Sequence, residues 1–298
     1  MKLARYSEDR LVAEITRGLP TGANLRVGAG DECAVIGTPR AARWTLLKAD
    51  AVVEDVHFLR TDDPRRVGWK ALCRAISDIA AMGGEPEHAL ITIAVSRDDD
   101  VTRVKALYAG LRRAARKFGV GIVGGETSRS PGPLFINVAL TGSVARTRCI
   151  LRSGARPGDV LFVTGHLGGS REGKHLDFTP RLAEARWLAR HFLPNAMMDL
   201  SDGLAADLPR LARASRCGFA LDASRLPVTP GCTVKQALGD GEDFELLFAL
   251  APRKAAGIGP KWRRTFPKLP LTEIGRVTQL STLNAQPLPH GHDHFADA

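Results

Sequence analysis

Hydrophobic and polar residues follow two different periods along the first half of the chain. Apolar residues alternate with others at 89–95 and 134–144, which is typical of strands, whereas apolar positions spaced by three and four at 64–82 and 98–118 are typical of helices. This alternation of elements predicts an α/β layer structure. Shorter strands are expected at 33–36, 44–48 and 122–123. A first helix is expected after the N-cap candidate Ser7, with the apolar stripe Leu11, Val12, Ile15 and Leu19.

The second half repeats the mixture after a turn-rich stretch. Residues 151–159 contain two glycines and a proline, a composition typical of loops. Strands are then expected at 160–164, 219–222, 244–249 and 273–277, and helices at 181–192, 205–215 and 233–238. We therefore predict two domains, an N-terminal one of residues 1–145 and a C-terminal one of residues 146–298.

Composition indicates a chain that folds without covalent cross-links. Its 298 residues are 44% hydrophobic, which is sufficient to bury a core in each of two domains. The five cysteines form no C-x-x-C pair, so reduced thiols are expected. The charged N-terminus lacks a signal-peptide pattern and no apolar run has the length of a membrane span. We expect a cytoplasmic protein that does not bind membranes.

The net charge of +10 raises the question of a polyanionic partner. The basic residues are spread over predicted helices, only 6% of residues are aromatic, and no nucleic-acid-binding motif is present. Solvated helix faces account for most of this charge. We therefore expect anionic small molecules, and no nucleic acid, as partners.

Acidic residues in glycine-bearing loops are the most informative chemical feature. Most of them lie at predicted strand ends or helix termini, where side chains converge on a cleft. Carboxylate oxygens suit Mg²⁺, which proteins hold with a few acids together with water and substrate phosphates. The segments are Gly30-Asp31-Glu32, Ala49-Asp50, Ser77-Asp78, Gly124-Gly125-Glu126, Asp199-Leu200-Ser201-Asp202-Gly203 and Gly241-Glu242-Asp243.

Structural roles compete with this interpretation at individual positions. Asp202 has the side chain of a helix N-cap for the helix that follows it, and Asp78 lies one turn after Arg74 on the same predicted helix. His57 follows two acids on a loop, yet a lone histidine more often serves packing or the surface. The small residues 80–84 after Asp78 favour close approach of a ligand.

A second nucleotide-binding motif has to be weighed as an alternative. Residues 168–175 nearly match the P-loop pattern G-x-x-x-x-G-K-[ST] after a predicted strand. His175 stands where the hydroxyl that ligates Mg²⁺ is required, and residues 176–180 do not begin a helix cleanly. The pattern therefore argues against a P-loop, and little effect is expected from His175→Ala.

In order and spacing these segments resemble the thiamine-phosphate kinases of the PurM-like ATP-binding superfamily, nearly from end to end. Beyond the acidic loops, the resemblance rests on Asp50 with His57-Phe58 seven residues on, on residues 77–83, on Gly124-Gly125-Glu126-Thr127, and on the stretch from Arg152 to Asp159. It also includes residues 241–246 and the terminal Gly291-His292-Asp293-His294-Phe295.

The resemblance implies both fold and reaction. The fold is two-domain and PurM-like: an N-terminal mixed sheet with helices forms the dimer half-barrel and binds ATP and Mg²⁺, and a C-terminal α/β domain follows. A homodimer is implied, with ATP beside the interface. The reaction is ATP-dependent phosphorylation of thiamine phosphate to thiamine diphosphate, by direct attack on the γ-phosphorus with several Mg²⁺ ions.

The resemblance also implies roles for individual residues. It assigns magnesium to Asp31, Asp50, Asp78, Glu126, Asp199 and Asp202, with Asp78 and Asp202 as the catalytic pair. It assigns ATP to Gly125, Glu126, Arg152 and Ser201, and thiamine phosphate to His57, Glu242 and His292.

The chain departs from the family pattern near these positions. Lys48-Ala49 replace a Ser/Thr pair of metal ligands, glutamates stand at Glu32 and Glu126, and His292 stands where an aromatic ring usually stacks. These departures leave two alternatives open: a PurM-like ATP-dependent enzyme with another small substrate, and a nucleotide-binding protein without turnover.

Overall fold

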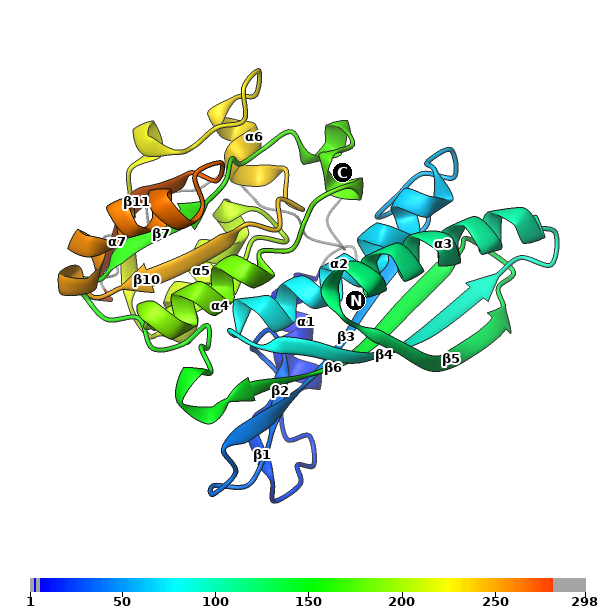
Figure 1. Cartoon of the computed structure of the whole chain (residues 1–298), viewed down its shortest axis with the longest axis horizontal. Helices are drawn as coiled ribbons and strands as arrows, with labels where there is room; N and C mark the ends of the chain where they lie inside the picture. The colour runs from blue at the N-terminus through cyan, green and yellow to red at the C-terminus, as the bar shows by residue number, and fades with distance from the viewer. Residues whose placement is uncertain (1–2, 4–5, 281–298) are drawn as a thin grey trace.

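The computed structural model describes Leu3 and residues 6–280. Within these residues the chain forms two sheets with helices packed on them (Figure 1). The six-stranded sheet is built from residues 25–145 and the five-stranded sheet from residues 160–278. The predicted division at residue 145 falls in the connection between them and stays a prediction.

The N-terminal sheet has the order β1-β2-β3-β6-β4-β5. Its neighbours pair antiparallel except β4 and β5, which are parallel and joined by a crossover through α3. The strands are β1 (Leu25–Val27), β2 (Ala34–Ile36), β3 (Arg43–Val53), β4 (Glu85–Val95), β5 (Gly121–Arg129) and β6 (Phe135–Ala145).

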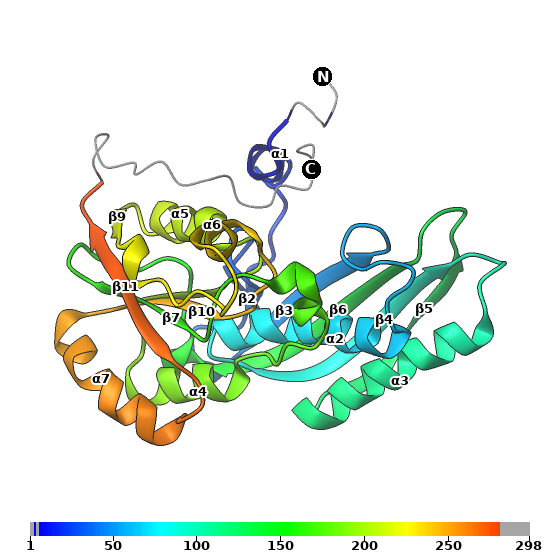
Figure 2. The same cartoon turned by 90° about the horizontal axis from the view of Figure 1, so that it is seen from above.

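Two long helices, α2 (Pro64–Ala81) and α3 (Val101–Phe118), cover one face of this sheet (Figure 2). Aspartate side chains cap both helices, Asp63 accepting from Arg65 N and Asp100 from Thr102 N. The helices approach so closely that a Cβ at Gly68 would lie 2.0 Å from the carbonyl oxygen of Leu107. Almost all of α2 is buried, so its polar residues face an interior cleft or neighbouring elements.

The opposite face of the N-terminal sheet carries no helix among the described residues. Strand residues alternate in exposure, as on β6, where each second residue is buried. On the uncovered face, Leu47, Leu90 and Val123 are exposed by 37%, 48% and 61%. Large apolar side chains are therefore left in water on this face.

The C-terminal sheet has the order β8-β10-β7-β11-β9 and is antiparallel throughout. Its strands are β7 (Val160–Thr164), β8 (Ala196–Asp199), β9 (Gly218–Leu221), β10 (Leu246–Leu250) and β11 (Leu271–Thr278). Helices α4 (Leu182–His191) and α7 (Pro252–Thr265) lie on one side of it, and α5 (Leu204–Ala214) and α6 (Val234–Gly239) on the other (Figure 2).

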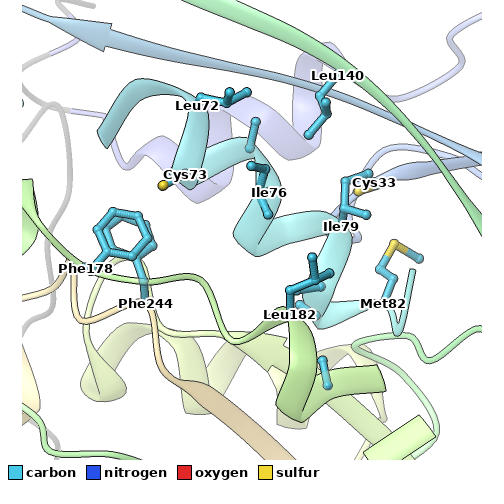
Figure 3. Packing of buried hydrophobic residues seen from close by; sticks show 14 of the residues in the cluster. Cys33, Leu72, Cys73, Ile76, Ile79, Met82, Leu140, Phe178, Leu182 and Phe244 are labelled. Atoms are coloured by element: carbon cyan, nitrogen blue, oxygen red, sulfur yellow. The ribbon is translucent and has the colours of Figure 1, made fainter. Parts of the chain in front are cut away.

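The two sheets share part of their hydrophobic core. Phe162 and Phe248, on the α4 side of the C-terminal sheet, belong to the same buried cluster as α2. Figure 3 shows Ile79 of α2 and Met82, the residue after α2, beside Leu182 of α4. This continuous packing fixes α2 between the sheets, so a side chain on α2 is held in place relative to both.

Most predicted elements are present, with differences at four elements. Helix α1 (Glu8–Ile15) begins after Ser7, but the Ser7 side chain makes no cap hydrogen bond and the helix buries none of its residues. The predicted helix is therefore present, but its expected side-chain cap is absent and it ends at Ile15, before Leu19. Strands β1 and β8 and helix α7 were not predicted, since β1 and β8 are short and Pro260 and two glycines interrupt the pattern of α7.

Candidate active site

A buried group of carboxylates lies where three chain segments meet. Glu32 comes from the loop before β2, Asp78 from the last turn of α2, and Asp199 from the end of β8. All three are buried, and one carboxylate oxygen of each lies within 4.8 Å of the others. Grouped, desolvated carboxylates repel one another, so the arrangement favours a bound cation.

Burial raises the pKa values of several acids in and beside this group. Burial, followed by repulsion from Glu32, raises the pKa of Asp199 to about 7. Burial also raises the pKa of Asp78 well above its usual range, against the nearby charge of Lys48. Burial raises the pKa of neighbouring Asp31 to about 6. Without a metal ion, part of this group is therefore protonated near neutral pH.

Lys48 is the cation that the protein itself places in this group. Its Nζ lies 2.8 Å from Asp78 Oδ1. Burial lowers the pKa of Lys48, but attraction to Asp78, Asp50 and Glu32 outweighs it and leaves that pKa above its usual value. The sequence-based alternative that Asp78 pairs with Arg74 is therefore wrong, because Asp78 pairs with Lys48 and Arg74 pairs elsewhere.

Arg152 joins the acid group to the loop between the domains. Its Nε and Nη2 donate to the two Glu32 carboxylate oxygens at 2.9 and 2.6 Å, and its backbone N donates to Asp31 at 3.2 Å. Burial raises the pKa of Glu32, but the charge and hydrogen bonds of Arg152 prevail and hold that pKa below its usual value. This bidentate pair favours the ionised form of Glu32, whereas burial disfavours the ionised forms of Asp78 and Asp199.

A cleft of about 720 Å³ opens beside the acid group. Its wall contains four of the predicted site residues, His57, Ser201, Asp202 and Glu242, together with Arg74 of α2. The rest of the lining is Asp55, Val56, Phe58, Leu59, Asp62, Arg66, Arg171, Glu172, Gly173, His175, Leu176 and Asp240. Its size and mixed lining fit a small organic molecule with charged groups.

Basic side chains surround Glu242 on one wall of the cleft. Glu242 Oε2 lies 2.8 Å from Lys70 Nζ and 3.1 Å from His175 Nδ1, and Glu242 Oε1 lies 3.8 Å from Arg74 Nη1. Burial raises the pKa of Glu242, but the hydrogen bond from His175 and the charges of Lys70 and Arg74 lower it to about 2. Burial lowers the pKa of Lys70 to about 8 despite Glu242.

Aromatic packing holds the chain segment that carries Glu242 in place. Phe244 stacks on Phe178 with ring centroids 3.9 Å apart (Figure 3). The Phe178 carbonyl accepts a hydrogen bond of 2.8 Å from Trp69 Nε1 on α2. Glu242 itself has a positive φ of 53°, a conformation that an L-residue adopts only when its surroundings impose it.

Asp202 lies at the other wall of the cleft, in the loop before α5. Arg210 contacts its carboxylate, and its backbone N donates to buried Asp207 at 3.0 Å. The cap position of α5 is Gly203 and it makes no side-chain cap bond, so the prediction that Asp202 caps this helix is wrong. The carboxylate of Asp202 instead lines the cleft.

Asp50 and Glu126 face opposite sides of the N-terminal sheet. Asp50 on β3 lies opposite Val138 on β6, and Val138 is buried under α2. Glu126 on β5 lies opposite Thr92 on β4, and Thr92 lies opposite Asn137 on β6, so Glu126 is on the uncovered face. Three strand spacings of about 4.8 Å separate β3 from β5. Within one copy of the chain, Glu126 therefore does not reach the acid group.

Gly125 has a structural reason to be glycine. Its φ is 151°, and a Cβ would lie 1.8 Å from the carbonyl oxygen of Ile91 on β4. The predicted ATP contact of this residue stays a prediction. His292 lies outside the described residues.

The P-loop alternative is wrong. Residues 168–176 form two short 3-10 turns, at Ser170–Glu172 and Lys174–Leu176, and no α-helix begins there. Lys174 Nζ donates to Asp243 and to the carbonyl of His166. The helix N-terminus that a P-loop uses for phosphate is absent from this segment.

Sequence reasoning missed the roles of Lys70, Arg74 and His175 in the cleft. Lys70, Arg74 and Asp78 are spaced by four residues, which places them on one face of α2. That spacing was available in the sequence, since charged residues on one face of an otherwise apolar helix indicate a polar cleft. Contact between His175 and Glu242 depends on two distant loops, and no local pattern predicts it.

Comparison with known proteins places these features in a family. Residues 30–144 match the AIR synthase related protein N-terminal domain and residues 156–282 the C-terminal domain. A thiamine-monophosphate kinase of Rhodopirellula baltica is 37% identical over 88% of this chain and 85% of its own length, and one of Bacillus subtilis is 32% identical over 90% of both. A solved structure described as AaThiL complexed with AMPPCP and TMP superposes with a TM-score of 0.82 at 31% identity, covering 99% of both chains.

Proposed function

This chain belongs to the thiamine-monophosphate kinases, with both AIR synthase related domains present, and we propose that it phosphorylates thiamine phosphate to thiamine diphosphate with ATP. One observation of its own geometry carries the proposal. The buried carboxylate group is linked to the cleft by Arg74, one turn before Asp78, and by Asp202, three residues after Asp199, and the cleft wall presents several carboxylates and two imidazoles. Such a cleft suits a cationic heteroaromatic ring that carries a phosphate, with the nucleotide phosphates at the acid group.

The reaction requires positioning more than covalent participation. An oxygen of the thiamine phosphate attacks the γ-phosphorus of ATP, the bond from that phosphorus to the β,γ-bridging oxygen breaks, and ADP leaves. We propose that Glu242 and His57 hold the thiamine ring, and that Arg152 and Ser201 contact the nucleotide. His292 and Gly125 remain proposed substrate and ATP contacts on family resemblance alone.

Magnesium is the proposed metal. The donor set fits it: Glu32, Asp78 and Asp199 converge with one oxygen of each within 4.8 Å of the others. Burial raises the pKa values of Asp78 and Asp199, and a bound cation would favour their ionised forms. Asp31, Asp50, Asp202 and, from a second copy, Glu126 are the further proposed ligands. Bound Mg²⁺ would neutralise the nucleotide phosphates, and Asp78 and Asp202 would hold it beside the reacting groups.

We also propose that two copies form a homodimer through the uncovered face of the N-terminal sheet. Leu47, Leu90 and Val123 are exposed there. Glu126 lies on the same face, so its proposed role at a nucleotide requires a neighbouring copy. A particle containing a single chain in analytical ultracentrifugation would contradict this proposal.

The proposed location is the cytoplasm, where ATP is available. None of the helices among the described residues combines the length and hydropathy needed to cross a bilayer. Recovery of the protein in a membrane or extracellular fraction would contradict the proposed location. The division into residues 1–145 and 146–298 remains part of the proposal.

The function is tested by coupled ADP release with Mg²⁺ and ATP, comparing thiamine phosphate, free thiamine and no acceptor. We expect ADP only with thiamine phosphate, together with thiamine diphosphate identified by mass spectrometry. Release with a different small acceptor would indicate another substrate in the same fold. ATP binding without ADP release under any of these conditions would indicate a protein that has lost turnover.

A further inference from the structure

Arg74 is a buried cation in the cleft wall whose hydrogen bonds are not satisfied. Its side chain is 12% exposed, and neither Nε nor Nη1 has a hydrogen-bond partner although both atoms are buried. Nε lies 3.2 Å from Asp50 Oδ2 without the geometry of a hydrogen bond, and Nη1 lies 3.8 Å from Glu242 Oε1, which also lacks a partner. A buried guanidinium in this state is costly unless a ligand accepts its N–H groups.

Arg74 also lies between the two chemical regions of the site. It follows Lys70 by one helical turn and precedes Asp78 by one turn. One side of its guanidinium faces Asp50, next to the acid group, and the other faces Glu242, in the cleft. Arg74 therefore lies between the acid group and the part of the cleft wall that carries Glu242.

The other basic side chains near this point are occupied. Lys70 is fully buried and contacts Glu242, His175 and the carbonyl of His57. Lys48 pairs with Asp78. Arg66 donates to Asp177 and to the carbonyl of Gly173. Among the described cleft residues, Arg74 is therefore the buried cation with donors to spare.

We propose that Arg74 binds the phosphate of the thiamine phosphate acceptor and thereby selects the phosphorylated substrate over free thiamine. The proposal rests on the function proposed above. A guanidinium presents a planar fork of donors that matches two phosphate oxygens, and it keeps its charge at all physiological pH values. No proton is transferred through it, since the attacking oxygen of the acceptor phosphate is already ionised.

The same contact has an electrostatic role. The acceptor phosphate has to approach both the γ-phosphate of ATP and the carboxylates of Asp50 and Glu242. Arg74 offsets this repulsion from a fixed position on a buried helix, so no reorganisation is needed when the substrate binds. We therefore expect its removal to weaken the binding of thiamine phosphate specifically.

The test compares equilibrium binding of thiamine phosphate and of free thiamine by titration calorimetry. Arg74→Met removes the charge with little change in volume, and Arg74→Lys keeps the charge but loses the fork. Arg65→Met, on the exposed side of the same helix and outside the cleft lining, is the matched control. Thermal denaturation establishes whether each variant is folded. If Arg74→Met is unfolded, the comparison is made with Arg74→Lys.

We expect Arg74→Met to weaken thiamine phosphate binding by at least about tenfold and thiamine binding by less than about twofold. Arg74→Lys should lie between, and Arg65→Met should match the wild type. Equal weakening of both ligands, or of neither, would overturn the proposal by assigning Arg74 a purely structural role. A wild-type protein that binds no thiamine phosphate would instead overturn the proposed function, and with it this inference.

Discussion

The two ends of the cleft-facing side of α2 have opposite chemistry. At the end of the helix, Asp78 joins Glu32 and Asp199 in a group of acids that surrounds Lys48. One and two turns earlier, Arg74 and Lys70 join His175 in a group of bases that surrounds Glu242. We refer to these as the acidic end and the basic end.

The comparison shows that each end lacks a different partner. At the acidic end, burial raises the pKa values of Asp78 and Asp199 although Lys48 pairs with Asp78 and Arg152 pairs with Glu32. At the basic end, burial lowers the pKa of Lys70 to about 8, and Arg74 keeps unsatisfied donors around one carboxylate. The acidic end therefore favours binding of cations, and the basic end favours binding of an anion. A phosphoryl transfer between anionic substrates needs both, because metal ions neutralise the phosphates and cationic side chains hold them.

The largest expected effect is the loss of activity on removing the charge of Asp78 at the acidic end. Asp78→Asn should lower kcat by at least about a hundredfold, because it removes a charge from the proposed metal group. The fold should persist, since asparagine has the same size and burial already raises the pKa of Asp78. Coupled ADP release and thermal denaturation measure the two effects.

Asp98→Asn is the matched control for this variant. Asp98 is an exposed carboxylate, with a side chain 85% accessible, near Arg97 on the surface. It should leave both activity and melting temperature unchanged. Near-normal turnover in Asp78→Asn would contradict the proposed metal centre.

A smaller effect is expected on removing Lys48, the cation at the acidic end, and it tests whether Lys48 competes with a metal ion. Lys48→Met should destabilise the metal-free protein by roughly 3 kcal/mol, because it leaves buried Asp78 without its paired cation, whereas Glu32 keeps Arg152. Mg²⁺ should then raise the melting temperature more than it does in the wild type, and bind about tenfold more tightly. Differential scanning fluorimetry with Mg²⁺ or a chelator, and Mg²⁺ titration, measure these effects. An equal response of both proteins to Mg²⁺ would show that Lys48 does not compete with a metal ion.

The smallest effect tests the basic end. His175→Ala should raise KM for thiamine phosphate about two- to fivefold, because Glu242 loses its contact with His175 but keeps the hydrogen bond from Lys70 and the nearby charge of Arg74. KM for ATP should not change, since no P-loop is present. Steady-state kinetics with each substrate varied in turn separate the two values. A tenfold loss of ATP affinity would contradict the assignment of His175 to the acceptor side.

Local patterns were sufficient to predict most of the architecture. The period-two runs of β4 and β6 and the apolar faces of α2 and α3 appear at the expected positions because burial of one face imposes that spacing. The cap of helix α1 was misjudged, because a serine before a helix makes the cap hydrogen bond only when its side chain adopts the required geometry. Strand β8 was missed because four residues carry too little periodicity to be recognised.

The sequence by itself determined which chemical groups were present and which loops carried them. Acidic residues beside glycines pointed to metal and phosphate, and their order along the chain matched a family. Only the tertiary structure decided how these groups pair. Asp78 faces Lys48 rather than Arg74, Glu126 lies on the opposite side of the sheet from Asp50, and Lys70 and His175 meet at Glu242. The physical reason is that charges separated by tens to hundreds of residues interact only after packing brings them within a few ångströms, and burial then sets the strength of that interaction.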